Sequence, residues 1–179
     1  MKYAIDVTLF KLREVKDQDH DWLVELHNDP VVLNNMTHCV PITHASHAAW
    51  WEKISVDHRQ LRLIFEVKGQ PAGFAKFYDI DYVNQNCVLG GDIHKQFRGQ
   101  GYAKLMWTLM LRKCFDEFEL YRVGLTTAEY NVIGRHVYEK LGFKEEGRLV
   151  KSLQRNNLYY DQILMRMLKP EWDAMEEQT

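Results

Sequence analysis

The sequence predicts a single mixed α/β domain of 179 residues. Its hydrophobic pattern alternates between the two-residue repeat of strands and the 3.6-residue repeat of helices. No linker, internal repeat or low-complexity segment interrupts this pattern. The length is sufficient for one hydrophobic core, and 46% hydrophobic and 27% charged residues are ordinary for a globular protein. We therefore expect one domain over residues 1–179, with its core at about residues 3–169.

The chain opens with a strand followed by a helix. Apolar and polar side chains alternate from Leu9 to Arg13, which predicts a strand over residues 5–15. Trp22, Leu23 and Leu26 then share one helical face. The following Asn-Asp-Pro segment ends this helix, because proline disfavours helical geometry in the residue before it.

The remaining elements are separated by turn residues such as Gly, Pro, Asn and Asp. Three further helices are predicted, at residues 44–55, 100–118 and 132–141. Six further strands are predicted, at residues 61–67, 72–80, 87–94, 121–127, 143–153 and 158–168. The last two strands form a hairpin across Arg155-Asn156-Asn157.

The most informative segment is Arg98-Gly99-Gln100-Gly101-Tyr102-Ala103, between a strand and a long helix. Its two glycines allow a sharp turn and let backbone N–H groups approach a bulky ligand. The first turn of a helix also offers unpaired N–H groups and the positive end of the helix dipole. The segment therefore predicts a site for a pyrophosphate or another polyanion. It is neither a P-loop nor the dinucleotide fingerprint, which needs a glycine where Lys104 stands.

Two motifs resemble the GNAT superfamily of N-acetyltransferases. Arg98-x-x-Gly101-x-Ala103 is similar to its pyrophosphate motif, Q/R-x-x-G-x-G/A, which Gln96-x-x-Gly99-x-Gly101 also fits. Tyr138-Glu-Lys-Leu-Gly-Phe143 resembles the segment leading into its closing hairpin, most closely in ribosomal-protein and polyamine N-acetyltransferases. The resemblance implies a mixed, mostly antiparallel sheet that splays between its fourth and fifth strands and is flanked by helices. It also implies transfer of an acetyl group from acetyl-CoA to a primary amine, by direct attack in a ternary complex.

The resemblance further implies roles for individual residues. The strand that ends at Ile93 would pair with the pantetheine arm, and the Ile93 N–H would stabilise the oxyanion. Asn131 would contact the cofactor arm, and Tyr138 would protonate the leaving thiolate. A phenol can do so if it is held within hydrogen-bond reach. The pyrophosphate would be held by Arg98, Gly99, Gln100, Gly101, Tyr102 and Ala103.

The general base is left open by the sequence. The positions at which relatives carry a glutamate are occupied here by Thr126 and Val88. Asp92 and His94 share one face of the strand next to the expected thioester, so either is a candidate base. A relay through water, without a dedicated base, is the third alternative.

Composition argues against several other functions. A net charge of −2 supplies no basic field for nucleic acid or anionic lipid. Cys39, Cys87 and Cys114 form no CxxC pair, which is typical of reduced thiols in a cytoplasmic protein. The N-terminal residues resemble neither a signal peptide nor a membrane span. We therefore expect a cytoplasmic protein, with a second copy of the chain as a partner left open.

The sequence leaves several alternatives open about metal binding, the acceptor pocket and the acceptor itself. His44-x-x-His47 has helical spacing for a metal but lacks a third ligand, so no metal site is expected. Trp50 and Trp51 either line the acceptor pocket or pack against neighbouring elements. The acceptor is a protein N-terminus, a polyamine or an amino sugar. The alternative to an enzyme is a non-catalytic module that binds or senses acyl-CoA.

Overall fold

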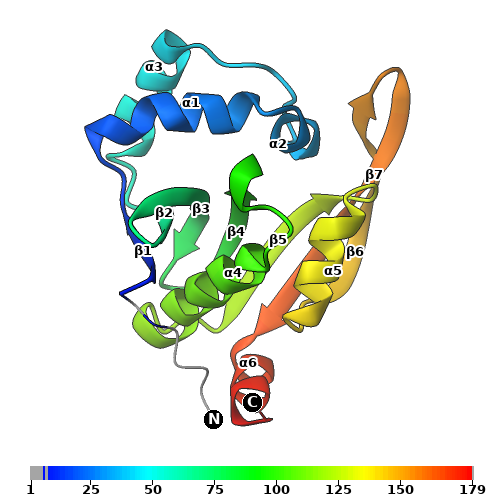
Figure 1. Cartoon of the computed structure of the whole chain (residues 1–179). Helices are drawn as coiled ribbons and strands as arrows, with labels where there is room; N and C mark the ends of the chain where they lie inside the picture. The colour runs from blue at the N-terminus through cyan, green and yellow to red at the C-terminus, as the bar shows by residue number, and fades with distance from the viewer. Residues whose placement is uncertain (1–5, 7, 179) are drawn as a thin grey trace.

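The computed structural model describes residue 6 and residues 8–178, and shows one seven-stranded sheet flanked by helices (Figure 1). The strands are β1 (Phe10–Glu14), β2 (Leu61–Val67), β3 (Gln70–Asp81), β4 (Asn86–Ile93), β5 (Arg122–Ala128), β6 (Lys144–Arg155) and β7 (Leu158–Leu168). The helices are α1 (His20–Asn28), α2 (Pro30–Asn35), α3 (His44–Ile54), α4 (Tyr102–Arg112), α5 (Val132–Lys140) and α6 (Lys169–Gln178). Short helical turns lie at Asp17–Asp19, Lys95–Phe97 and Lys113–Glu117.

The sheet has the order β1-β2-β3-β4-β5-β7-β6. All neighbouring strands are antiparallel except β4 and β5, which are parallel. These two strands pair only at Asn86 with Arg122, Cys87 with Val123 and Val88 with Gly124. Beyond Val88 they diverge. The predicted mixed sheet with a splay between its fourth and fifth strands is therefore confirmed.

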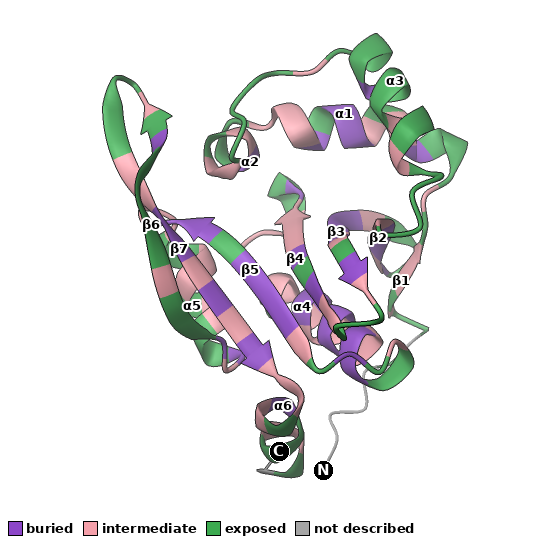
Figure 2. Ribbon diagram, turned by 180° about the vertical axis from the view of Figure 1, so that it is seen from behind, coloured by how far each residue is buried: buried purple, intermediate pink, exposed green. Residues whose placement is uncertain are grey.

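The two faces of the sheet bury separate clusters of apolar side chains. Figure 2 shows the buried segments of the strands and of the helices that cover them. On one face, Met106, Met110 and Leu111 of α4 are fully buried in the larger cluster. On the other face, residues of α1 and α2 pack against Ile64 and Phe74 of the sheet. Helices α1, α2 and α3 gather at one end of the molecule, near the carboxyl end of β4 (Figure 1). This end of β4 is where the predicted site residues lie.

Two helices, α2 and α6, are not predicted from the sequence. Pro30, which was expected only to end α1, is the first residue of α2, and Asp29 caps this helix by accepting bonds from the Val31 and Val32 N–H groups. Proline suits a first helical position because that N–H needs no helical partner. Helix α6, which follows β7 directly, was also not predicted. Its Trp172 is buried and stacks on Phe115, with ring centroids 6.0 Å apart.

Other predicted boundaries shift by a few residues. The first strand covers only Phe10–Glu14 of the predicted 5–15, since residues 8 and 9 form a turn and Ile5 lies outside the described residues. The helix predicted over 100–118 begins only at Tyr102 and changes from α-helix to a π-turn after Arg112. The last hairpin turns on Asn156 and Asn157, whose φ values of 49° and 64° are those of a tight two-residue turn.

The helices found between residues 8 and 178 include none with the length and apolar character needed to span a membrane.

Candidate active site

The free edge of β4 faces the gap left by the divergence of β5. The His94 N–H donates to the Ala72 carbonyl across the β3–β4 pair, at 2.9 Å. Because successive residues of an antiparallel strand direct their N–H groups to opposite sides, the Ile93 N–H points away from β3. It therefore points toward the gap. This is the orientation that an oxyanion or a strand-like ligand requires of it.

Gly90 and Gly91 are required by close packing on both faces of β4. A Cβ atom at Gly91 would lie 2.6 Å from Met106 Cε, and one at Gly90 would lie 3.1 Å from Tyr78 Cε2. Pairing with β3 continues in register through both glycines, so the strand is not bulged there. The glycines thus let α4 and Tyr78 approach the strand while it stays extended.

The glycine-rich loop has the geometry of an anion cradle. Gly99 and Gly101 have φ values of 74° and 82°, a left-handed conformation that side chains rarely adopt. A Cβ at either position would meet no atom within 4 Å, so the described residues leave space beside the loop. Gly101 is the N-cap of α4, and the N–H groups of the first helical turn have no partner within the helix. These residues fit a bound pyrophosphate.

Arg98 does not direct its side chain toward that space. Its Nε donates to the Ile93 carbonyl at 2.9 Å, and its Nη2 donates to Asp29 Oδ1 at 2.7 Å. The pKa of Asp29 is lowered because Arg98 and two backbone N–H groups outweigh its partial burial. Arg98 therefore joins the end of β4 to the start of α2.

The other loop side chains are also engaged elsewhere. Gln100 Nε2 donates to the Gln96 carbonyl at 2.8 Å. The Tyr102 ring packs between Phe10 and Phe97, with centroid distances of 6.1 and 6.0 Å. Ala103 is half-buried in the first turn of α4. The backbone of this loop, more than its side chains, is available to a ligand.

Asn131 caps the helix that carries Tyr138. Its Oδ1 accepts from the Gly134 N–H at 3.1 Å, and its Nδ2 donates to Thr127 Oγ1 at 3.0 Å. The side-chain amide thus fixes the start of α5 on the end of β5. Its carbonyl group and one amide proton are committed within the protein.

Tyr138 is held by aromatic neighbours on the α4 side of the gap. Its ring centroid lies 4.7 Å from that of Trp107 and 6.2 Å from that of Phe143. Burial raises the pKa of Tyr138 well above its ordinary value, and the Asp92 carboxylate raises it further. The phenol is therefore protonated at neutral pH and can act as a proton donor. Trp107 Nε1 also lies 3.4 Å from the place that a Cβ would take at Gly91, so the indole lies near β4 as well as near Tyr138.

Asp92 is paired with Lys76, a residue that sequence reasoning missed. Lys76 Nζ contacts Asp92 Oδ2, and only 12% and 16% of the two side chains are exposed. Burial opposes the charge on Lys76, but Asp92 and Tyr78 outweigh it and raise the pKa of Lys76. The carboxylate that was a candidate base thus already holds a cation. Lys76 lies on β3, and the sequence pattern of this strand gives no indication that Lys76 pairs with Asp92.

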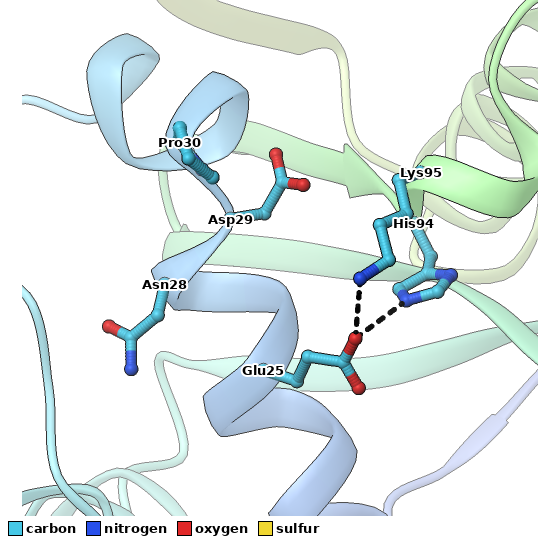
Figure 3. Close-up of a pocket in the computed structure, with 6 residues that line it drawn as sticks. All are labelled: Glu25, Asn28, Asp29, Pro30, His94 and Lys95. Carbon is cyan, nitrogen blue, oxygen red and sulfur yellow. Dashed lines mark hydrogen bonds and ion pairs between the residues drawn. The ribbon is translucent and has the colours of Figure 1, made fainter.

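His94 is the candidate base whose ring nitrogens make no hydrogen bond among the described residues. The residue is 5% exposed. His94 lines a pocket of about 250 Å³ with Glu25, Asn28, Asp29, Pro30 and Lys95 (Figure 3). Glu25 Oε1 lies 3.6 Å from His94 Nε2 and 2.9 Å from Lys95 Nζ.

The far end of α2 is tied to the other side of the gap. The Tyr130 hydroxyl donates to the Asn34 carbonyl at 2.6 Å. Arg155, near the tip of the β6–β7 hairpin, donates to the Asn34 carbonyl at 3.2 Å and to the Met36 carbonyl. These contacts connect the helical layer to the β5–β7 side of the sheet.

The remaining candidates from the sequence lie away from this site. The Cys87 and Cys114 thiols are buried and 3.5 Å apart, and burial raises the pKa of Cys114. Trp51 packs edge-on against His20, whose Nδ1 lies 3.0 Å from His47 Nε2. Within the described part of the chain, no three His, Cys, Asp or Glu side chains are grouped so as to hold a metal ion.

Known proteins resemble the chain over most of its length. Residues 10–144 match the family model of the acetyltransferase (GNAT) domain. YdaF of Bacillus subtilis (strain 168), which carries the name of a ribosomal N-acetyltransferase, is 29% identical over 124 residues, 69% of this chain and 68% of YdaF. Spermidine N(1)-acetyltransferase of Escherichia coli (strain K12) is 24% identical over 164 residues, 92% of this chain and 88% of that protein.

The fold agrees with this relationship. The crystal structure of spermidine N-acetyltransferase from Vibrio cholerae in complex with CoA and spermine superimposes with a TM-score of 0.86 at 22% identity, covering 92% of this chain and 98% of that one. The splayed sheet, the glycine loop and the family match agree with one another. The chain therefore belongs to the GNAT family of acetyltransferases.

Proposed function

We propose that the protein transfers the acetyl group of acetyl-CoA to a primary amine of a small molecule, by direct attack in a ternary complex. The observation that carries this proposal is the gap between β4 and β5. The free edge of β4 borders this gap, the open glycine loop follows β4, and Tyr138 packs on Trp107 of the helix that the loop begins.

The protein holds the co-substrate mainly through its backbone. The edge of β4 from Leu89 to Ile93 pairs with the pantetheine arm as an added strand would. The N–H groups from Gly99 to Ala103 bind the pyrophosphate, assisted by the α4 dipole. Asn131 acts by fixing the start of α5. This division of roles is supported by the internal engagement of the Arg98, Gln100 and Asn131 side chains.

His94 receives the proton that activates the amine. Its ring nitrogens make no hydrogen bond with the described residues, which favours it over Asp92, whose carboxylate pairs with Lys76. The neutral amine nitrogen then forms a bond to the thioester carbonyl carbon. The Ile93 N–H donates to the oxygen as negative charge develops on it.

Tyr138 completes the reaction as the carbon–sulfur bond breaks. Its hydroxyl donates a proton to the leaving sulfur. The second proton that the nitrogen loses on becoming an amide restores the phenol, and His94 returns its own proton to water. Every proton is accounted for without a covalent enzyme intermediate.

The acceptor is proposed to be a small molecule because of the relatives. Those with 24% identity over nearly the whole chain are named for a polyamine acceptor, whereas YdaF is named for a ribosomal one. A protein N-terminus and an amino sugar remain the competing acceptors. The cytoplasmic setting and a homodimer remain predictions. The described residues carry no observation that favours a non-catalytic acyl-CoA sensor.

A thiol-release assay with acetyl-CoA tests this function. Spermidine, a short peptide with a free N-terminus and glucosamine serve as acceptors at equal concentration. We expect release of CoA with at least one of them and the acetylated amine in the mass spectrum. If acetyl-CoA binds but no amine in a broad panel releases thiol, the enzymatic function is wrong and a sensor is favoured.

A further inference from the structure

The pocket beside His94 combines two features that point to a ligand. His94 is almost fully buried, yet neither of its ring nitrogens makes a hydrogen bond with the part of the chain that the structure describes. Such a group costs free energy unless something binds to it. The adjacent carboxylate of Glu25 is 56% exposed, and its Oε1 lies 3.6 Å from His94 Nε2. An acceptor on each side is suited to an amine, which donates in more than one direction.

An ammonium group already contacts the Glu25 carboxylate. Lys95 Nζ contacts Glu25 Oε1 at 2.9 Å, and both side chains are 56% exposed (Figure 3). The pair lowers the pKa of Glu25 and raises that of Lys95, so both groups are charged at neutral pH. Exposed ion pairs of this kind contribute only about 0–1 kcal/mol. Another ammonium can therefore displace Lys95 readily.

Glu25 is the carboxylate near the pocket that can bind an incoming amine, because Asp29 and Asp92 already have stronger partners. Asp29 Oδ1 accepts bonds from Arg98 and from the Val31 and Val32 N–H groups. Asp92, on the same face of β4, is paired with Lys76. Lys95 shows that an unbranched chain of four carbons places an ammonium group on Glu25.

We propose that Glu25 and His94 form the amine-binding end of the acceptor site, and that Lys95 occupies this place until an acceptor displaces it. This inference rests on the proposed function. It names the acceptor as a primary ammonium on an unbranched alkyl chain, and Lys95 as an internal competitor for it. His94 directly follows Ile93, so an amine bound there lies beside the strand end that faces the thioester.

The experiment compares Lys95→Met, Glu25→Gln and the wild type with two probe amines. n-Butylamine reproduces the Lys95 side chain, and sec-butylamine is its branched isomer. For n-butylamine we expect Lys95→Met to lower KM about two- to fivefold, which corresponds to the loss of an exposed ion pair. Glu25→Gln should raise KM by up to about fivefold, because the charge of the same exposed carboxylate no longer attracts the ammonium group. Lys53→Met removes an exposed lysine of α3 and should change neither value.

Equilibrium binding separates this inference from the proposed function. Calorimetric titration of n-butylamine into the enzyme saturated with CoA should show the same order of affinities. Lys95→Met should bind the amine most tightly, the wild type less tightly and Glu25→Gln most weakly. If the amine binds in this order but is never acetylated, the proposed function fails and the subsite stands. A higher or unchanged KM and Kd in Lys95→Met would overturn the role of Lys95. Unchanged binding in Glu25→Gln, undetectable binding of n-butylamine, or equal binding of sec-butylamine would overturn the subsite.

Discussion

The ion pair between Arg98 and Asp29 joins the glycine loop to the N-cap of α2. Arg98 Nη2 lies 2.7 Å from Asp29 Oδ1, and Arg98 Nε lies 2.9 Å from the Ile93 carbonyl. One guanidinium therefore contacts both the strand end proposed to face the thioester and the helix that borders the proposed amine pocket. Its planar fork of donors suits this double role, which a lysine would not fill. The two proposed binding regions are thereby held at a fixed separation.

The glycine loop is tested by Gly101→Val. A β-branched residue at a φ of 82° costs about 1–2 kcal/mol in the left-handed region, and its side chain enters the space proposed for the pyrophosphate. We expect the variant to fold but to bind acetyl-CoA at least about tenfold more weakly, because charge-assisted hydrogen bonds are lost. Gly69→Val, at a φ of 79° in the β2–β3 turn, carries similar strain and should bind acetyl-CoA normally. Unchanged affinity of folded Gly101→Val in titration calorimetry would remove the assignment.

Tyr138→Phe isolates the proposed proton donor. The substitution keeps the ring against Trp107 and deletes only the hydroxyl group, so acetyl-CoA should still bind. General acid catalysis contributes about 10²–10⁴-fold, and we expect the single-turnover rate to fall within that range. Tyr121→Phe removes the hydroxyl of an exposed tyrosine just before β5 and serves as the control. A wild-type single-turnover rate in Tyr138→Phe would exclude the tyrosine as the acid.

The base is tested by the pH dependence of kcat/KM. A base must be deprotonated to act, so activity falls on the acidic side as it becomes protonated. We expect His94→Gln to abolish this acidic limb and to lower kcat/KM, whereas Asp92→Asn keeps the limb. The opposite pattern would assign the base to Asp92. If both variants keep the limb, it belongs to the substrate amine, which must itself be neutral to attack.

The stability that helix α6 contributes to the fold is expected to depend on the charge of Glu171. Partial burial opposes that charge, but Lys144, Arg166 and the Leu168 N–H outweigh it and lower the pKa of Glu171 to about 2, from an ordinary value of 4.5. Because the pKa is lower in the folded protein, the stabilisation is complete above pH 4.5 and is lost as the pH falls toward 2. Glu171→Gln should reduce the free energy of unfolding by about 1 kcal/mol at pH 7.

Urea unfolding at two pH values checks the prediction for Glu171. The difference between Glu171→Gln and the wild type should be smaller at pH 3.5 than at pH 7. Glu177→Gln, an exposed change on the same helix, should show no such difference. A deficit for Glu171→Gln that is equal at both pH values would contradict the electrostatic explanation.

The sequence predicts what depends on local pattern and misses what depends on distant partners. Strand β2 has the predicted bounds because its alternation and its flanking turn are local signals. The glycine loop, Asn131 and Tyr138 come from short motifs. Glu25 and Lys95 are 70 residues apart, and Asp29 and Arg98 are 69 residues apart. No local sequence pattern therefore predicts either ion pair.

The missed helices have the same explanation. Pro30 was interpreted only as a stop signal, although the Asp29 cap allows it to start a helix. Helix α6 is largely polar, and its stability rests on Trp172 against Phe115 and on Glu171 against Lys144. Both contacts cross long stretches of sequence. Tertiary packing, which a local periodicity does not contain, decides these elements.

The parting of β4 and β5 after Val88 also has a kinetic consequence. If a pantetheine arm completes the open edge, substrate and product share its backbone contacts except the one proposed between the Ile93 N–H and the acetyl oxygen, since acetyl-CoA and CoA differ only in the acetyl group. CoA is then bound almost as tightly as acetyl-CoA, and its dissociation requires the backbone hydrogen bonds along the strand to break one after another. Inhibition by the accumulated product follows from the shape of the sheet, whichever amine receives the acetyl group.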